Sequence, residues 1–507
     1  MKLRTIVKIA ITSSVVLLCS GFALYSFFRL SAAEGQKDFN LYELVPSTTS
    51  AVFVTDDVLE FVAEVDELTC SKNQQYLYVS KLFSYLKQSL YALSEDTPHG
   101  LSRQMNQMLI SFHEPDNERN QVLYCRLGNG DKELVNRFVR KYISSLYPPK
   151  TFIYKGEEII IYPMADGDFL ACYLTSDFMA LSFQKKLIEN VIDAYKSGKS
   201  LADDSTFTGI RAPKKSAAAA TIYTRMQGMM GWTEFDMKMK DDFIYFSGIT
   251  HDADTCFAFI NQLRQQQSVK GFPGEVLPST AFYFSRQGIT DWVSLLSYGN
   301  AQGQSVPART SEVQNRDKEF SRYLMEKDAA AVLSLSVADV TEAERMLRAL
   351  VNAAPADEGR RNPRITFCYT VNKAYPIYRL PQTTLFEQLT SFAEPTLDVY
   401  AAFYGGRLLL APDADALAHY IRQLDKGEVL NGAMAYQTGM DHLSDSYHFM
   451  LMADFDHIFQ QSENHVRFVP DFFLRNADFF RHFTFFVQFA CADGVVYPNI
   501  VLKYKSE

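Results

Sequence analysis

The sequence predicts an α+β fold of two tandem homologous modules, with mainly antiparallel sheets and packed helices, preceded by one N-terminal transmembrane helix. Three observations support this prediction. An uncharged, mostly apolar run lies near the start of the chain, short blocks of sequence recur about 230 positions apart, and strand-like alternating runs are mixed with amphipathic helical ones. The strict strand–helix alternation of a parallel α/β enzyme is missing from the pattern.

The composition is that of a large globular body. The chain has 507 residues, of which 47% are hydrophobic, so disorder of the whole chain is excluded. Only 24 Gly and 18 Pro occur, which excludes a collagen-like or low-complexity chain. The 39 Phe and 28 Tyr favour sheet-rich structure with large cores.

The formal net charge of −9 is unevenly placed along the chain. The first 34 residues contain four basic residues against one acidic residue, so the rest of the chain is more acidic than the total. Because an acidic body repels phosphate groups, we expect no nucleic-acid partner.

The apolar run covers residues 9–28 and contains no charged residue. At about 1.5 Å per residue, a helix of this length crosses a hydrocarbon core of about 30 Å. Basic residues precede the run, so the positive-inside rule places the N-terminus in the cytoplasm and the body outside. We therefore expect residues 1–34 to be a cytoplasmic tip and signal-anchor in the inner (cytoplasmic) membrane, with a periplasmic body.

Two alternatives to an uncleaved anchor remain open. A cleaved signal peptide could end at the small residues Ser31 and Ala33, although the apolar run is longer than such signals need. A lipoprotein would use Cys19, although Leu18 stands where a small residue is wanted. The length of the run favours the anchor.

Blocks of sequence recur between the two halves of the chain. Residues 43–48 (ELVPST) recur as 275–280 (EVLPST), at an offset of 232. The strand-like runs that follow, at 51–54 and 281–284, align at an offset of 230. We therefore expect a first α+β module over residues 35–270 and a second over 271–507.

Further blocks support the duplication. Residues 169–173 align with 399–403 at an offset of 230, and the following helices share apolar positions. Gly198 aligns with Gly427 at an offset of 229, where a glycine ends a helix at low cost. In the second module, Asp493-Gly494 between two apolar runs predicts a hairpin turn. These shared residues are structural, so the duplication predicts fold and not chemistry.

The cysteines do not suggest a disulfide framework. Beyond Cys19 they are widely scattered, without a C-x-x-C pair, and four lie within apolar strand-like runs. We predict buried free thiols that behave as small apolar side chains. One incidental disulfide stays open, because the space outside the inner membrane can be oxidising.

The sequence contains no P-loop, G-x-S-x-G, H-E-x-x-H or EF-hand motif. Histidines and aspartates do gather near the C-terminus, and their side chains are those that zinc or manganese prefers. They are His442, His448, His457 and His465 with Asp441, Asp445, Asp454 and Asp456. Their spacing matches no usual ligand pattern, so a solvated strand edge is favoured, and we predict no metal site and no cofactor.

Two further groups of residues are candidates for chemistry. Asp166-Gly167-Asp168 offers two neighbouring carboxylates for acid–base work, but Asp and Gly between strands are typical of a plain turn. Pro-Ser-Thr occurs at 46–48 and again at 278–280, but no base at fixed spacing would activate a hydroxyl there. The structural interpretation is favoured for both, and the catalytic residues are unknown.

The apolar anchor, followed by LVPSTTSAVFV, SGKSLADDSTF and VLPSTAFYF, resembles a Bacteroidetes-type family of membrane-anchored extracytoplasmic proteins of unknown function. The resemblance covers nearly the whole chain after the anchor, and its motifs are structural. It implies a bacterial envelope protein and transfers no catalytic or ligand residue.

These observations lead us to expect a non-catalytic, membrane-tethered binding or scaffold protein of the bacterial envelope, with an envelope protein as partner. The seam between the modules is where we expect a binding site. The alternatives are an extracytoplasmic hydrolase acting on an envelope polymer and a purely structural strut. Converging carboxylates in a cleft would indicate the hydrolase, and a broad exposed apolar patch would indicate the strut.

Overall fold

The structure is a computed structural model. It describes residues 39–73, 105–113, 119–128, 131–138, 147–164, 167–210, 218–225, 232–250, 264, 266–288, 319–325, 331–337, 339–353, 364–380, 399–460 and 471–505. The predicted anchor at residues 9–28 lies outside these ranges, as does Cys19. Within them, no helix has both the length and the apolar character that crossing a bilayer requires.

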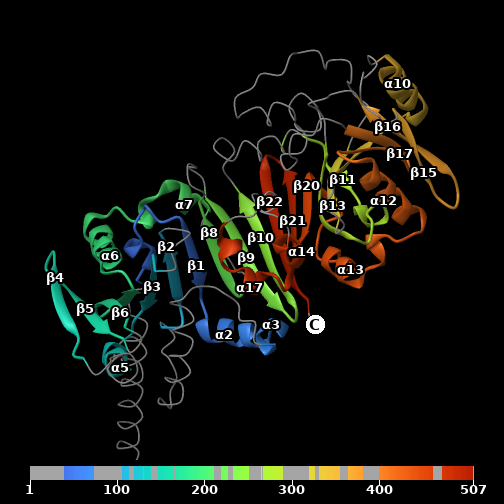
Figure 1. Ribbon diagram of the computed structural model, residues 1–507. Helices are drawn as coiled ribbons and strands as arrows, with labels where there is room; N and C mark the ends of the chain where they lie inside the picture. Colours follow the sequence, from blue (N-terminus) through green and yellow to red (C-terminus); the bar gives the residue numbers. More distant parts are fainter. Residues whose placement is uncertain are drawn as a thin grey trace, which may run out of the picture.

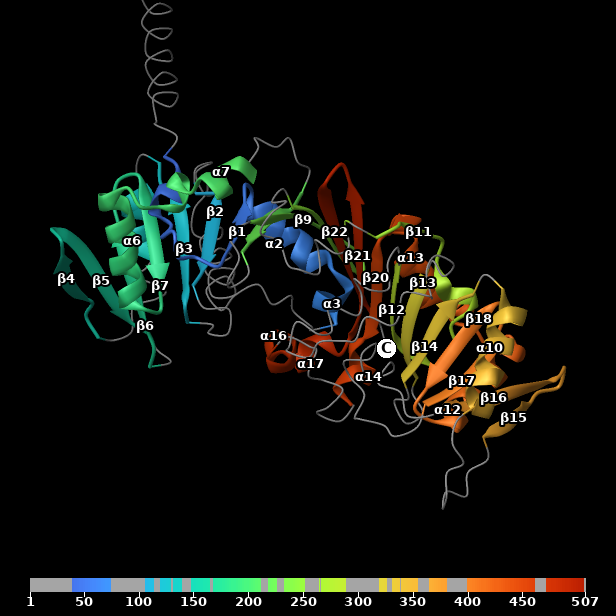
Figure 2. The same cartoon turned by 90° about the horizontal axis from the view of Figure 1, so that it is seen from above.

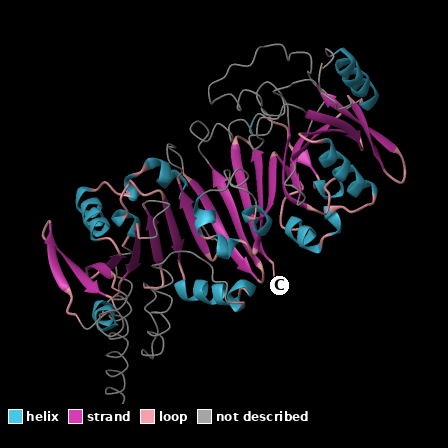
Figure 3. Cartoon of the chain, viewed as in Figure 1, coloured by secondary structure: helices cyan, strands magenta, loops and turns pink. Residues whose placement is uncertain are grey.

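The predicted fold class is wrong. The described residues are mostly antiparallel sheet, with 43% in strands against 31% in helices. Twenty strands of the described chain join in one sheet instead of forming separate sheets in two modules. Figure 3 shows these strands extending from one end of the molecule to the other. The sheet crosses the predicted module boundary through the pairing of β10 (Phe243–Thr250) with β22 (Val495–Tyr504). The physical reason for the single sheet is that β10 would otherwise leave backbone N–H and C=O groups unpaired along one side. β22 satisfies these groups.

The first half of the chain supplies ten strands at one end of the sheet, and we call these the first half-sheet. Every pairing among them is antiparallel. From the outside inwards they are β4 (Lys150–Tyr154), β5 (Glu157–Pro163), β6 (Phe169–Leu174), β7 (Phe178–Ser182), β3 (Gln121–Arg126), β2 (Met108–Phe112), β1 (Ala51–Thr55), β8 (Ala220–Thr224), β9 (Thr233–Lys240) and β10.

The second half-sheet repeats this order in reverse, so its outermost strand is β15, at the opposite end of an elongated molecule from β4 (Figures 1 and 2). Its pairings are also antiparallel. From the inside outwards its strands are β22, β21 (Phe483–Ala492), β20 (Phe449–Asp454), β12 (Ala281–Gly288), β13 (Glu319–Met325), β14 (Ala331–Ser336), β18 (Arg407–Ala411), β17 (Val399–Tyr404), β16 (Ala374–Leu380) and β15 (Ile365–Tyr369). A separate small sheet pairs β11 (Val269–Lys270) with β19 (Ser446–Tyr447).

The two half-sheets meet about a local two-fold axis at the β10–β22 pair, which we call the seam. The hairpins β9–β10 and β21–β22 are equivalent at an offset of 252 residues. Ile244 pairs with Leu502, and Thr250 pairs with Val496. At the offset of 252, Ile244 corresponds to Val496 and Thr250 corresponds to Leu502. The pair Ile244–Leu502 therefore corresponds to the pair Val496–Thr250. The contact therefore has the self-complementary geometry of a two-fold dimer interface.

Strand registers correct the sequence alignment by one or two residues. Cys172 pairs with Leu181, and Ala401 pairs with Leu410, so β6 and β7 match β17 and β18 at an offset of 229 rather than 230. By the same comparison β1 matches β12 at 232 rather than 230. The one-residue correction matters for the core, because a shift of one residue moves every side chain of a strand to the other face of the sheet.

Apolar cores cover both faces of the sheet. Neighbouring side chains of β2 lie on opposite faces of the sheet. Ile110 belongs to an apolar layer that extends over both half-sheets, and Leu109 belongs to a layer confined to the first half-sheet. A third core covers the same face as Leu109 in the second half-sheet. We call the two sides the continuous face and the divided face. The continuous layer binds both half-sheets into one body.

Helices cover each face in both halves. Those on the continuous face are α2 (Val58–Glu67), α3 (Thr69–Lys72), α5 (Asp131–Phe138), α10 (Val340–Ala353), α14 (Phe455–Phe459), α16 (Asp471–Arg475) and α17 (Ala477–Phe480). Those on the divided face are α6 (Lys185–Ser197), α7 (Ser205–Ile210), α12 (Ala414–Asp425) and α13 (Met434–Met440), with the 3-10 helices η1 (Leu41–Leu44), η3 (Leu201–Asp203), η4 (Pro273–Glu275) and η5 (Leu430–Gly432).

Local turn predictions are confirmed. Gly198 ends α6 with a φ of 64°, and Gly427 follows α12 with a φ of 74°. Both values lie in the left-handed region that glycine adopts without strain. Asp493 and Gly494 form the predicted turn between β21 and β22, with φ of 51° and 78°.

Packing at the seam generates a test of stability. A Cβ at Gly248 of β10 would lie 2.6 Å from Cγ of Pro498 and 2.7 Å from Cδ1 of Phe235. We expect Gly248→Ala to lower the free energy of unfolding by about 1–3 kcal/mol, because both rings must shift. Urea unfolding measures the change.

The matched control is Gly209→Ala in α7, where a Cβ meets nothing within 4 Å. Alanine is also the better helix former, so this substitution should be neutral or stabilising. An equal loss in both variants would contradict tight packing at the seam.

Candidate functional site

The C-terminal histidines lie on opposite faces of the sheet. The ring of His442 packs edge-on against Phe243 and Tyr245 of β10 on the divided face, with centroids 4.8 and 4.7 Å away. The ring of His457 stacks on Phe282 at 5.8 Å, and its helix, α14, covers the continuous face. A sheet therefore separates two of the four histidines.

Two further members of this group, His448 and Asp454, have structural contacts. The Nδ1 of His448 accepts a hydrogen bond from the N–H of Cys491 at 3.2 Å, and burial lowers the pKa of His448. Asp454 caps the N-terminus of α14 and forms an ion pair with Lys505 at 2.7 Å. His465 lies outside the described residues. Across the described ranges, no three His, Cys, Asp or Glu side chains are placed to hold a metal ion.

The acidic turn at 166–168 closes the connection between β5 and β6. The N–H of Met164 donates to the carbonyl of Asp168 at 2.8 Å, and Gly167 has a φ of 88°. Oδ1 of Asp168 lies 2.6 Å from Nη2 of Arg119 in an ion pair. Asp166 lies outside the described residues. The contacts of Asp168 agree with the turn interpretation.

Both Pro-Ser-Thr turns pair with the segment that follows a helix. Pro46 forms a β-bridge with Ser200, and Pro278 forms the equivalent bridge with Val429. In the second half, the N–H of Ser279 also donates to the carbonyl of Glu428 at 2.9 Å. These contacts fit the expected structural role of the turns.

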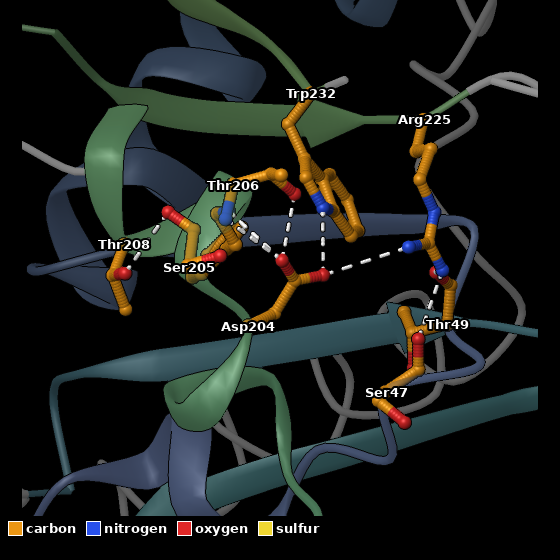
Figure 4. A network of polar contacts seen from close by, with 9 residues as sticks. Ser47, Thr49, Asp204, Ser205, Thr206, Thr208, Arg225 and Trp232 are labelled. Atoms are coloured by element: carbon orange, nitrogen blue, oxygen red, sulfur yellow. Dashed lines mark hydrogen bonds and ion pairs between the residues drawn. The ribbon is translucent and has the colours of Figure 1, made fainter. Parts of the chain in front are cut away.

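In the first half, a polar network centred on Asp204 and Arg225 holds the turn in place (Figure 4), and we call it the Asp204 network. Arg225 donates from Nη2 to the carbonyls of Ser47 and Thr49, at 2.8 and 3.3 Å. Its Nη1 lies 3.5 Å from Oδ2 of Asp204. The buried indole of Trp232 donates to the same oxygen at 3.3 Å. The network joins the turn to β8 and β9.

The carboxylate of Asp204 is fully engaged within this network. Its Oδ1 accepts from the N–H and hydroxyl of Thr206 at 2.9 and 2.6 Å and from the N–H of Phe207 at 3.3 Å, which caps α7. Burial raises the pKa of Asp204, but the hydrogen bonds from Thr206, Phe207 and Trp232 outweigh it and hold the pKa below its ordinary value. A carboxylate held in this way is a structural cap and not a general base.

The second half holds its turn by different contacts. At an offset of 229, Ala433 takes the place of Asp204, and α13 begins there without a side-chain cap. Tyr420 of α12 instead donates its hydroxyl to the carbonyl of Val276 at 2.6 Å. The two halves therefore share a backbone arrangement but not the side chains that stabilise it.

A Ser–His contact in β2 is also structural. Oγ of Ser111 lies 2.9 Å from Nε2 of His113 and 3.0 Å from the hydroxyl of Tyr124. A nucleophile beside a base is the arrangement of covalent catalysis. However, Ser111 is completely buried, and burial lowers the pKa of His113 to about 4 and raises the pKa of Tyr124. A substrate has no access to this hydroxyl.

At the seam, where we expected a binding site, the two halves are joined by backbone pairing and ring contacts. β10 and β22 are hydrogen-bonded along it, and His442 from the second half packs against two aromatic rings of the first. Within the second half, Lys503 of β22 donates to the hydroxyl of Thr438 on α13.

Exposed large apolar side chains gather on the two outermost hairpins, β4–β5 and β15–β16. Of the fourteen such residues in the described chain, eight lie on or beside these hairpins at opposite ends of the sheet (Figure 1). They are Tyr147, Phe152, Ile153 and Phe169 at one end and Ile365, Phe367, Tyr369 and Val371 at the other. Single exposed apolar residues are ordinary, but gathered ones mark contact surfaces.

Two of these residues occupy equivalent positions. Thr151 of β4 and Cys172 of β6 pair with the same residue of β5, which lies between them. In the same way, Ile365 of β15 and Ala401 of β17 pair with the same residue of β16. Cys172 and Ala401 are equivalent, so Ile153 and Phe367, two residues further along each outer strand, are equivalent as well. Their side chains are 67% and 54% exposed.

Sequence reasoning missed these outer hairpins. The sequence is strand-like at residues 150–163 and 365–370, but apolar runs of this kind also occur in buried strands. One signal was available at β4, where Pro148-Pro149 precede the strand and Lys150 begins it, since prolines and lysines are typical of edge strands. At β15 a similar signal stands just before the strand, in Pro363 and Arg364.

Comparison with known proteins adds no functional assignment. No protein-family model, curated protein or solved structure matches this chain. The roles of the residues described above therefore rest on their own geometry, and the geometry places the most distinctive surface of the described chain on its two outer hairpins.

The Asp204 network and its missing counterpart generate a paired test. We expect Asp204→Ala to destabilise the fold by about 1–3 kcal/mol, because it removes a helix cap and leaves buried donors without an acceptor. Ala433→Asp, at the equivalent N-cap with a similar extended backbone, should stabilise it by about 0.5–2 kcal/mol. Denaturant unfolding compares both with the unsubstituted chain. Equal effects of the same sign would refute the cap interpretation.

His113 generates a pH test. Burial holds its pKa at about 4, below its ordinary 6.5, so the folded protein keeps the ring neutral where the unfolded chain protonates it. The neutral ring of His113 therefore makes its full contribution to the free energy of unfolding above about pH 6.5. This contribution is lost as the pH falls towards about 4. Between pH 7 and 5, the free energy of unfolding of His113→Gln should fall by about 1–2 kcal/mol less than that of the unsubstituted protein. Parallel losses would contradict a buried neutral ring.

Proposed function

We propose that this protein is a non-catalytic binding or scaffold protein of the bacterial envelope, tethered to the inner membrane by its N-terminal segment with its body outside the cytoplasm. The observation that carries the proposal is the gathering of exposed apolar side chains on two hairpins at opposite ends of one sheet (Figure 2). The location rests on the apolar run and basic residues of positions 1–34.

The sheet between the hairpins is suited to hold them at a fixed separation. Its strands are joined by unbroken antiparallel pairing from β4 to β15, and the continuous layer packs on it across both halves. Close-packed interiors transmit strain and resist compression. A body of this kind keeps two contact surfaces apart, which is the mechanical requirement of a scaffold.

Polar and nucleophilic groups in the described residues serve structure. The carboxylates of Asp204 and Asp454 cap helices. The thiols of Cys125 and Cys172 are buried, and burial raises the pKa of each to about 12, which suppresses the reactive thiolate. These assignments favour binding over catalysis.

Photo-crosslinking in intact cells tests this proposal. A photoreactive phenylalanine is placed at Ile153 or at Phe367, with Met434 of α13 as a control that is equally accessible but lies outside both hairpins. We expect adducts with envelope proteins from both hairpin positions and none from Met434. Absence of adducts at both hairpins, or hydrolysis of an envelope polymer by the purified protein, would refute the scaffold and favour the hydrolase alternative.

A further inference from the structure

We propose that β15 is the docking edge for a second copy of this chain, and that two copies join by antiparallel pairing of their β15 strands about a two-fold axis at Phe367. The inference rests on the proposed scaffold function and names the partner of one of the two outermost hairpins, β15–β16. Four observations carry it: the backbone of β15, its side chains, the contrast with β4, and the geometry of the seam.

The backbone of β15 offers hydrogen bonds outward. The N–H of Arg379 donates to the carbonyl of Arg364, and the N–H of Thr370 donates to the carbonyl of Lys373. Even-numbered residues of this strand therefore bond to β16, and because inward and outward groups alternate, odd-numbered ones direct N–H and C=O away from it. In the described chain, β16 is the strand that pairs with β15. The outward residues are Ile365, Phe367 and Tyr369.

These same three residues expose their side chains on one face. Ile365, Phe367 and Tyr369 are 36%, 54% and 74% exposed, and the rings of the last two lie 6.2 Å apart. On the other face, Cys368 is buried and its thiol lies 3.5 Å from the carbonyl of Ala418 in α12. Within the described residues, this edge of the sheet thus combines backbone groups that pair with no other strand with an apolar stripe.

The opposite edge, β4, differs from β15 in carrying a cation within the strand. Lys150 begins β4, and the ammonium of Lys185 lies 5.0 Å from the ring centroid of Phe152. The basic residues next to β15, Arg364 and Lys373, lie outside the strand. Lysines at an edge discourage strand addition. The five residues of β15 (ITFCY) include no charge and no proline.

The stripe is complementary to itself. A two-fold axis at the central residue places Phe367 opposite Phe367 of the second copy and Ile365 opposite its Tyr369. Aromatic and β-branched pairs of this kind stabilise antiparallel strands. The flanking cations are held within their own copy, because Arg364 donates to the carbonyl of Val351 and Lys373 lies 4.5 Å from the ring centroid of Tyr375. No like charges face each other within the paired strands.

The seam shows that this architecture already joins two equivalent edges in the same way. There, β10 and β22 pair antiparallel about a local two-fold axis and extend one sheet into the next. Pairing of β15 with itself would repeat that geometry at the outer edge. A five-residue strand buries less area than the about 1,200–2,000 Å² of stable interfaces, so we expect a reversible dimer.

Charge substitution at Phe367 tests the pairing in the full-length protein in detergent micelles, by sedimentation over a concentration series. Phe367→Lys and Phe367→Glu each place like charges opposite one another, and each should weaken self-association at least about tenfold. An equimolar mixture of the two variants should restore it, because opposite charges then meet at the axis. Ile153→Lys, at the equivalent exposed position of β4, should leave it unchanged.

The inference is overturned if the unsubstituted protein stays monomeric at about 100 μM, if Phe367→Lys associates as the unsubstituted protein does, or if the mixture fails to restore association. Such a result, with photo-adducts from Phe367 to other envelope proteins, would leave the scaffold function standing with a different partner. Restored association of the mixture, with adducts from Phe367 only to a second copy of this chain and none from Ile153, would support the dimer and refute the wider scaffold function.

Discussion

The backbone pairing of β10 with β22 is the constraint on which the rest of the structure depends. It converts two sets of ten strands into one sheet and allows a single apolar layer to extend across both. Without it, each half would expose a long strand edge and the border of its core, both of which favour aggregation. The pairing also fixes the directions in which β4 and β15 face, so the outer hairpins owe their positions to a contact at the centre of the molecule.

The two half-sheets keep the same strand order while their side chains have diverged. The first half holds its Pro-Ser-Thr turn through Arg225 and Asp204, whereas the second uses the hydroxyl of Tyr420. The same divergence separates the edges, because β4 contains Lys150 within the strand whereas β15 contains no charged residue. Backbone pairing tolerates such change, since it depends on N–H and C=O groups that every residue except proline supplies. Divergence at the edges is what gives the two ends different binding properties.

Short-range features could be predicted from the sequence, and long-range ones could not. Glycine at helix ends and Asp493-Gly494 at a hairpin follow from local backbone preferences, and the structure has them there. The single sheet was missed because β10 and β22 lie some 250 residues apart, and no local pattern reports such a pairing. The alignment of residues 169–173 was wrong by one position, because apolar residues stand on both faces of a buried strand. The exposed side of β15 was missed for the same reason.

The distance along the chain between β10 and β22 has a consequence for biogenesis. β10 is complete at Thr250, but the strand that covers its edge ends only at Tyr504. At about 5–20 residues per second, synthesis of the intervening segment takes about 12–50 s. During that interval the nascent protein carries an uncapped edge, and every prematurely terminated product retains it. Chaperones and proteases of quality control can recognise this uncovered strand edge of β10.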